Sequence, residues 1–110
     1  MGNVSRFIEP VVLRILKEKQ ASYGYEIAEW LPGYALTDAK IEGAALYRTL
    51  RTLEANGYVQ STWTAGAGPA RRNYRLTPAG EEHLQEWARL LQSLGKAMIQ
   101  FAGECGEVKP

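Results

Sequence analysis

Four arginines have the side-chain type and the spacing to bind a polyanion. Arg48 and Arg51 lie in a segment whose leucines recur at helical intervals, and Arg71 and Arg72 are adjacent after a glycine-rich stretch. A guanidinium group offers several N–H donors to phosphate oxygens, so clustered arginines are typical of proteins that bind nucleic acid. These side chains are therefore the first candidates for a functional surface.

The charges are unevenly distributed along the chain, although the net charge is only +1. Residues 40–77 hold six basic and two acidic side chains, a net charge of +4. Residues 1–39 have a net charge of −1, and residues 78–110 one of −2. A nearly neutral protein with a basic middle segment can present a local positive patch, which is what a polyanion recognises.

Catalysis and metal binding have few candidate residues. The chain contains one histidine, His83, and one cysteine, Cys105. A single cysteine cannot form an intrachain disulfide, and the two residues together are too few to make a structural zinc site. No glycine-rich phosphate loop follows a strand, and no pair of carboxylates converges. We therefore expect no enzyme activity, no cofactor and no metal. His83 is expected to face solvent in an acidic first helical turn, and Cys105 to be inert or loosely exposed.

Length and composition indicate one soluble globular domain. The 110 residues are 45% hydrophobic and 23% charged. No apolar run approaches the ~20 residues that a membrane span needs, and the N-terminal residues lack the apolar core of a signal peptide. The sequence thus predicts a cytoplasmic protein without a membrane partner, of a size at which pairing with a second copy adds stability.

The hydrophobic pattern predicts four helices and one hairpin. The first helix covers residues 10–19, and a second, short helix is capped by Ser22 and stopped by Pro32–Gly33. A third helix runs from about Glu42 to Asn56–Gly57. Strands at 58–64 and 71–77, joined by a turn at 65–70, follow it, and a last helix starts at Thr77–Pro78. The fold class is mainly α with a small two-stranded β-hairpin. We expect a winged helix-turn-helix over residues 1–77 and a C-terminal dimerisation helix with its tail over 78–110, within the same compact unit.

The third predicted helix has two different faces. At about 100° per residue its leucines lie together on one side, and the side expected nearest the bases of DNA carries Ala44, Tyr47, Arg48 and Arg51. A small residue such as Ala44 allows close approach to the floor of a groove. The alternative is an exposed face with arginines for solubility. In the wing, Arg71 and Arg72 are expected to reach a phosphate or the minor groove, and Tyr74 and Leu76 to pack onto the core.

The last helix carries an apolar seam with heptad spacing over three heptads. Its members are Leu84, Trp87, Leu91, Leu94, Met98 and Phe101. Packing on the same domain, as expected around Leu84, accounts for part of this stripe, and pairing with a second copy accounts for the rest. A homodimer would set two recognition helices roughly 34–36 Å apart and so predicts a palindromic operator. Trp87 and its mate across the axis could then form a slot for a small hydrophobic effector.

Three motifs, in order along the chain, resemble the PadR family of winged-helix transcriptional regulators. They are YGYEI at 23–27, LYRTLRTLEANGYV at 46–59 and GPARRNYRLTPAG at 68–80, and the resemblance covers about residues 10–84. It implies a dimeric protein that binds double-stranded DNA, usually a repressor, and that often releases its operator when a small aromatic or other hydrophobic effector binds.

The resemblance also implies roles for individual residues. Tyr23 falls where the tyrosine of the family's second helix meets the DNA backbone, and we favour it over Tyr25 as a phosphate contact, although both could be interior. Tyr47 and Arg48 fall on the recognition helix, and Arg71 with Arg72 match the basic wing.

The chain departs from the family pattern at two places. Glu42 stands where a Ser, Thr or Asn usually caps the recognition helix, and its charge would lie near DNA phosphates. The last helix is short, which favours the compact subclass of the family. The remaining alternative to sequence-specific DNA binding is a winged-helix module that binds other proteins.

Overall fold

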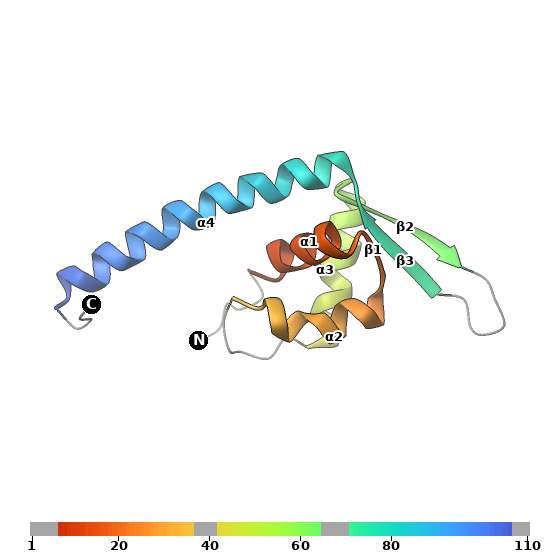
Figure 1. The fold of residues 1–110 in the computed structure, drawn as a ribbon, viewed down its shortest axis with the longest axis horizontal. Coiled ribbons are helices and arrows are strands. Elements are labelled where there is room, and N and C mark those ends of the chain that lie inside the picture. The colour runs from red at the N-terminus through yellow and green to blue at the C-terminus, as the bar shows by residue number, and fades with distance from the viewer. Residues whose placement is uncertain (1–6, 37–41, 65–70, 107–110) are drawn as a thin grey trace.

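The structure is a computed structural model that describes residues 7–36, 42–64 and 71–106. Its elements are α1 (Ile8–Lys19), β1 (Ala21–Tyr23), α2 (Gly24–Tyr34), α3 (Gly43–Ala55), β2 (Val59–Thr64), β3 (Arg71–Leu76) and α4 (Pro78–Glu104) (Figure 1). The predicted helices and hairpin are confirmed in order and type. The turn predicted at 65–70 and the connection at 37–41 lie outside the described residues.

The core forms around α1, which contacts α2, α3, α4 and β3. Val12, Leu13 and Ile15 are 0% exposed, because the apolar residues of this helix cover more than half of its circumference. The partners that the other elements contribute to this core are Ile27, Leu31, Leu46, Leu50, Leu53, Val59 and Tyr74. Burying one large aliphatic side chain contributes about 1.5–3 kcal/mol, so this core fixes α2 and α3 relative to each other.

The sheet has three strands, one more than the sequence predicts. The strand order is β1–β3–β2, and both pairings are antiparallel. Ser22, expected to cap the second helix, pairs with Tyr74 in this ladder, and Tyr23 is the N-cap instead. Gln20, with φ of 69°, turns the chain out of α1 so that β1 reaches the second edge of β3. A strand of three residues is too short to show an alternating pattern in the sequence.

α2 continues beyond its predicted end. The backbone N–H of Tyr23 donates to Oε1 of Glu26 at 2.8 Å, a contact that fixes the start of the helix. The helix then includes Pro32 and ends at Tyr34, so the prediction of a stop at Pro32–Gly33 is wrong. Pro32 removes one helical hydrogen bond, and the packing of Tyr34 against the core favours the last turn despite this loss.

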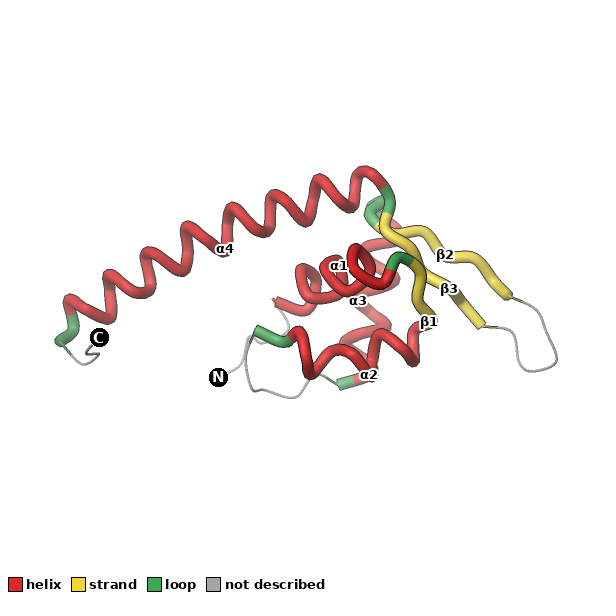
Figure 2. The backbone as a smooth tube through the Cα atoms, in the orientation of Figure 1, coloured by secondary structure: helices red, strands yellow, loops and turns green. Residues whose placement is uncertain are grey.

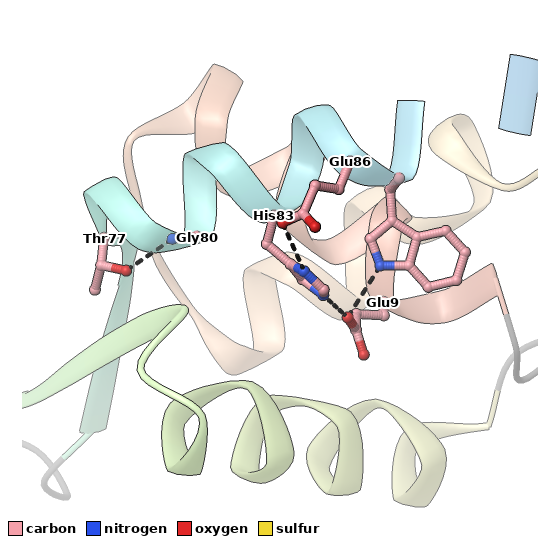
Figure 3. Close-up of polar contacts among 6 residues, drawn as sticks. Glu9, Thr77, Gly80, His83 and Glu86 are labelled. Atoms are coloured by element: carbon pink, nitrogen blue, oxygen red, sulfur yellow. Dashed lines mark hydrogen bonds and ion pairs between the residues drawn. The ribbon is translucent and has the colours of Figure 1, made fainter. Parts of the chain in front are cut away.

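α4 begins on the body of the molecule and then projects away from it (Figures 1 and 2). Oγ1 of Thr77 accepts from the backbone N–H of Gly80 at 3.0 Å (Figure 3), as the predicted start of this helix requires. Leu84 and Trp87 pack against the core, which confirms that part of the seam stays within the domain. The exposed large apolar side chains of α4 are Leu90, Leu94, Met98, Ile99 and Phe101. No helix in the described part of the chain has the length and apolarity to cross a membrane.

His83 does not face solvent, so that prediction is wrong. Its ring stacks on Tyr58 with centroids 3.9 Å apart and planes 7° from parallel. Its Nε2 pairs with the carboxylate of Glu9 (Figure 3), and its side chain is only 22% exposed. Tyr58 and Glu9 are distant in the sequence, so the acidic neighbours of His83 could not reveal them, although one neighbour, Glu86, lies 3.8 Å from its Nδ1 (Figure 3). Cys105 is exposed, as predicted.

Candidate nucleic-acid interface

The first turn of α3 is capped by backbone groups alone. The carbonyl of Glu42 accepts from the N–H groups of Ala45 at 3.0 Å and Leu46 at 3.2 Å, and the Glu42 side chain makes no capping hydrogen bond. This confirms Glu42 at the cap. The negative charge of its carboxylate interacts favourably with the dipole of α3 but repels phosphate groups. It therefore limits how closely an anion can approach this end of the helix.

The two faces of α3 differ as the periodicity predicts. Its three leucines are 0% exposed and belong to the core. The opposite face is exposed and carries Ala44, Tyr47, Arg48, Arg51 and Thr52. A face with two arginines and no acidic side chain attracts polyanions, and its small first residue leaves room for a close approach.

Tyr47 connects α3 to the start of α2 through a contact that only glycine permits. A Cβ atom at Gly24 would lie 2.7 Å from Cε1 of Tyr47 and 2.9 Å from its hydroxyl oxygen. Gly24 is buried, whereas Tyr47 remains 41% exposed. The ring thus packs against the start of α2 on one side and is exposed on the other, so its hydroxyl group is accessible beside α2.

Arg71 of the wing lies against two aromatic rings of β1 and α2. The rings of Tyr23 and Tyr25 stack with centroids 5.8 Å apart, and the Arg71 guanidinium carbon lies 5.9 Å and 5.5 Å from those centroids. Nη1 of Arg71 donates to the Tyr25 hydroxyl at 3.3 Å. Such cation–π contacts contribute about 0.5–1 kcal/mol at exposed sites, so they orient the guanidinium and leave most of its donors available.

These groups meet at one place on the surface. An open pocket of about 180 Å³ lies where α2, α3 and β3 come together, and its lining includes Tyr23, Gly24, Tyr47, Arg71 and Arg72. The structure therefore brings together candidate residues from three segments of the sequence. Ala44, Arg48 and Arg51 are exposed on α3, which contributes Tyr47 to this pocket.

Arg72 also lines this pocket, but it alternates with Arg71 along β3 and its guanidinium has partners within the protein. Its guanidinium lies 5.0 Å from the ring centroid of Trp63, and its Nη1 is 3.9 Å from Oε1 of Glu54. Glu54 also accepts from the backbone N–H and the hydroxyl of Ser61. Because side chains alternate between the two faces of a strand, Arg72 lies on the same face as the buried Tyr74 and Arg71 lies on the other face. This alternation can be read from the sequence and distinguishes the two arginines.

The sequence interpretation gave too little weight to two residues. Tyr25, ranked below Tyr23 as a phosphate contact, is 47% exposed and hydrogen bonds Arg71, whereas Tyr23 is half-buried. Arg75 is exposed on the same face of β3 as Arg71. The two-residue period of a strand could have placed Arg75 on the same face as Arg71 from the sequence alone. The hydrophobic pattern, in contrast, does not predict β1, the strand that supplies Tyr23.

The sequence of residues 12–86 matches the transcriptional regulator PadR-like family. The chain belongs to this family. Members of the PadR-like family are transcriptional regulators and not enzymes, in agreement with the expectation from the sequence that this protein is not an enzyme. The resemblance carried by the three motifs is confirmed.

Relatives of this PadR-family protein agree with that assignment. Transcriptional regulator Rv3488 of Mycobacterium tuberculosis is 40% identical over 60 residues, which are 54% of this chain and 56% of the relative. The chain thus spans little more than half the length of that relative. A transcriptional regulator from Clostridium thermocellum superposes with a TM-score of 0.80 at 27% identity over 92% of this chain and 96% of its own. PadR of Bacillus subtilis in complex with operator DNA shares the fold, with a TM-score of 0.66 at 23% identity over 76% of this chain and 47% of its own.

Proposed function

We propose that this PadR-family protein is a homodimer that binds duplex DNA at a palindromic operator and represses transcription. The observation that carries the proposal is the meeting of Tyr47 from α3 with Arg71 from the wing around one pocket, on the helix that exposes Arg48 and Arg51. A recognition helix enters the major groove while flanking groups bind phosphates. We assign the base-reading role to Ala44, Tyr47, Arg48 and Arg51, and backbone contacts to Tyr23, Arg71 and Arg72.

Dimerisation through α4 is supported by the part of the seam that the domain does not cover. Leu94 is 36%, Met98 57% and Phe101 68% exposed. A contiguous apolar strip of this kind is unusual on a monomer and fits a second copy of the same helix. In this proposal residues 1–77 form the DNA-binding part, and residues 78–110 join the two copies, with the inner end of the seam, Leu84, Trp87 and Leu91, nearest the domain.

We further propose that a small hydrophobic or aromatic effector releases the repressor from DNA. The support is Trp87, whose ring packs against the core while its side chain stays half-buried at the start of the exposed seam. A planar ligand inserted beside two such rings would change how the α4 helices pack.

Selection of bound duplexes from a random pool tests the DNA-binding proposal. We expect an inverted repeat whose half-sites lie about one helical turn, roughly 34–36 Å, apart. Repeating the selection with Arg48→Ala should relax the preference at one base pair of each half-site, by about 1–3 kcal/mol if the guanidinium binds a guanine edge. Enrichment of no sequence would refute the proposal and favour a protein-interaction module, and an equal loss on every sequence would make Arg48 a phosphate contact.

The two adjacent wing arginines are expected to behave differently. Arg71→Ala should weaken binding to all duplexes and lower the slope of log affinity against log salt by about 0.9 for each phosphate that the variant no longer binds. Arg72→Ala should change that slope less and lower the thermal midpoint instead, because Arg72 pairs with Glu54 and packs on Trp63. Salt titrations of a fixed duplex by fluorescence anisotropy provide the measurement. Equal slopes for both variants and the parent protein would remove the wing from the interface.

A further inference from the structure

The junction between α1 and α4 contains a polar cluster that DNA binding does not use directly. Glu9, in the first turn of α1, accepts from Nε1 of Trp87 at 3.0 Å and pairs with Nε2 of His83 (Figure 3). His83 and Trp87 are four residues apart on α4 and therefore on one face of that helix. One carboxylate of α1 thus holds two successive turns of α4.

This cluster is more enclosed than the other ion pair between the two helices. The side chains of Glu9 and His83 are 27% and 22% exposed, whereas Lys17 and Glu81, 3.1 Å apart, are 43% and 56% exposed. An exposed ion pair contributes little because water and salt screen it. A shielded carboxylate that accepts from two groups contributes more, and leaving those groups unpaired is unfavourable. Glu9 therefore dominates the polar attachment of α4 to α1.

The cluster lies at the end of α4 that contacts the body, and the rest of this long helix projects away from it. Within the described residues, α4 packs on the body near its start, through Gly80, His83, Leu84 and Trp87, and its large apolar side chains from Leu94 onward are exposed. From Trp87 to Glu104 the helix extends roughly 25 Å, so a tilt of about 5° at the junction moves its end by roughly 2 Å. Two such displacements in a symmetric dimer are comparable to the rise of one base pair, about 3.4 Å.

We propose that Glu9 is a positioning residue that determines the half-site spacing the dimer accepts, by fixing the angle between α4 and the DNA-binding part. The inference rests on the proposed dimer and its operator. Glu9 does not touch DNA in this arrangement; it acts through Trp87 and His83. Removal of the carboxylate frees the angle of α4 without altering α3, so each half-site is still bound while the distance between the two is no longer fixed.

The test compares four variants on one series of duplexes. Glu9→Ala removes the acceptor, Glu9→Gln keeps an oxygen for the Trp87 N–H, and Trp87→Phe keeps a large ring without the donor. Glu18→Ala is the matched control, because Glu18 is a carboxylate of the same helix that pairs with Arg14 on α1 itself. The duplexes carry the selected inverted repeat with its spacer changed in steps of one base pair, together with a single half-site. Sedimentation and circular dichroism establish that each variant is folded and dimeric.

We expect Glu9→Ala to bind the best spacing about tenfold more weakly than the parent protein, to bind neighbouring spacings almost equally well, and to keep its affinity for the single half-site. Glu9→Gln should recover most of the preference, Trp87→Phe should fall between, and Glu18→Ala should match the parent. A folded, dimeric Glu9→Ala protein with the parent's spacing preference would overturn the role of Glu9 and leave the proposed function intact. If Glu9→Ala fails to fold, Glu9→Gln and Trp87→Phe decide the test. A spacing preference of Trp87→Phe equal to that of the parent protein would then refute the proposal. A parent protein that binds no inverted repeat would overturn the function and this inference together.

Discussion

Replacing Met98 with arginine is expected to convert the protein from a dimer to a monomer and to lower its affinity for a palindromic operator by about 10²- to 10⁴-fold. Met98 is 57% exposed, so an arginine there leaves the domain's own core intact. In the proposed dimer it would meet its symmetry mate, and two unpaired charges would be buried in an apolar seam. Sedimentation equilibrium measures the mass, and a gel shift on the palindrome measures the affinity.

Gln100→Arg is the control for this experiment. Gln100 is exposed on α4 and lies about 160° around the helix from Met98, so the same charge enters the same helix on the side away from the seam. It should remain dimeric and bind as the parent does. A dimeric Met98→Arg protein with full affinity would mean that the copies pair through another surface.

Gly80→Ala is expected to lower the free energy of unfolding by about 2–3 kcal/mol. A Cβ atom at Gly80 would lie 1.9 Å from the carbonyl oxygen of Tyr58, which also accepts from the backbone N–H of Thr77 at 3.1 Å. The neighbour is a backbone group in the turn between α3 and β2, so it cannot move aside as a flexible side chain would. Urea unfolding at one fixed protein concentration measures the change, since dimerisation would contribute to the apparent stability.

Gly103→Ala is the matched control for that substitution. A Cβ atom at Gly103 would meet nothing within 4 Å, and Gly103 lies inside α4 near its end. Alanine favours a helix over glycine, so its unfolding free energy should be unchanged or slightly higher. Equal destabilisation by both variants would indicate a general sensitivity of α4 and not the close approach of Tyr58 to Gly80.

The helices could be predicted because their apolar residues recur over three or more turns. The period identifies α1, α3 and α4, and the cap at Thr77 fixes the start of the last. β1 could not be found in this way, because its existence depends on a free edge of β3 that lies more than 45 residues away in the sequence. The end of α2 was misjudged for a related reason, since tertiary packing of Tyr34 outweighs the local effect of Pro32.

The candidate interface could be predicted in part. Helical angles alone put Arg48 and Arg51 on the face opposite the buried leucines, and the structure exposes both. The contact of Tyr47 with Gly24 and that of Arg72 with Glu54 depend on how separate elements pack, which no local pattern records. His83 illustrates the same limit, because Glu9 and Tyr58, which pair and stack with it, are distant in the sequence, and the neighbouring Glu86, 3.8 Å from its Nδ1, does not reveal them.

The exposed outer half of α4 determines how steeply operator occupancy would depend on the concentration of the protein in the cell. If each operator requires two chains joined through that strip, occupancy at low expression rises with the square of the number of chains in the cell. Halving synthesis would then reduce binding by about fourfold instead of twofold. A stretch of apolar surface on one helix would thus make the genetic output threshold-like, with no added component and no change in how a single subunit reads a base pair.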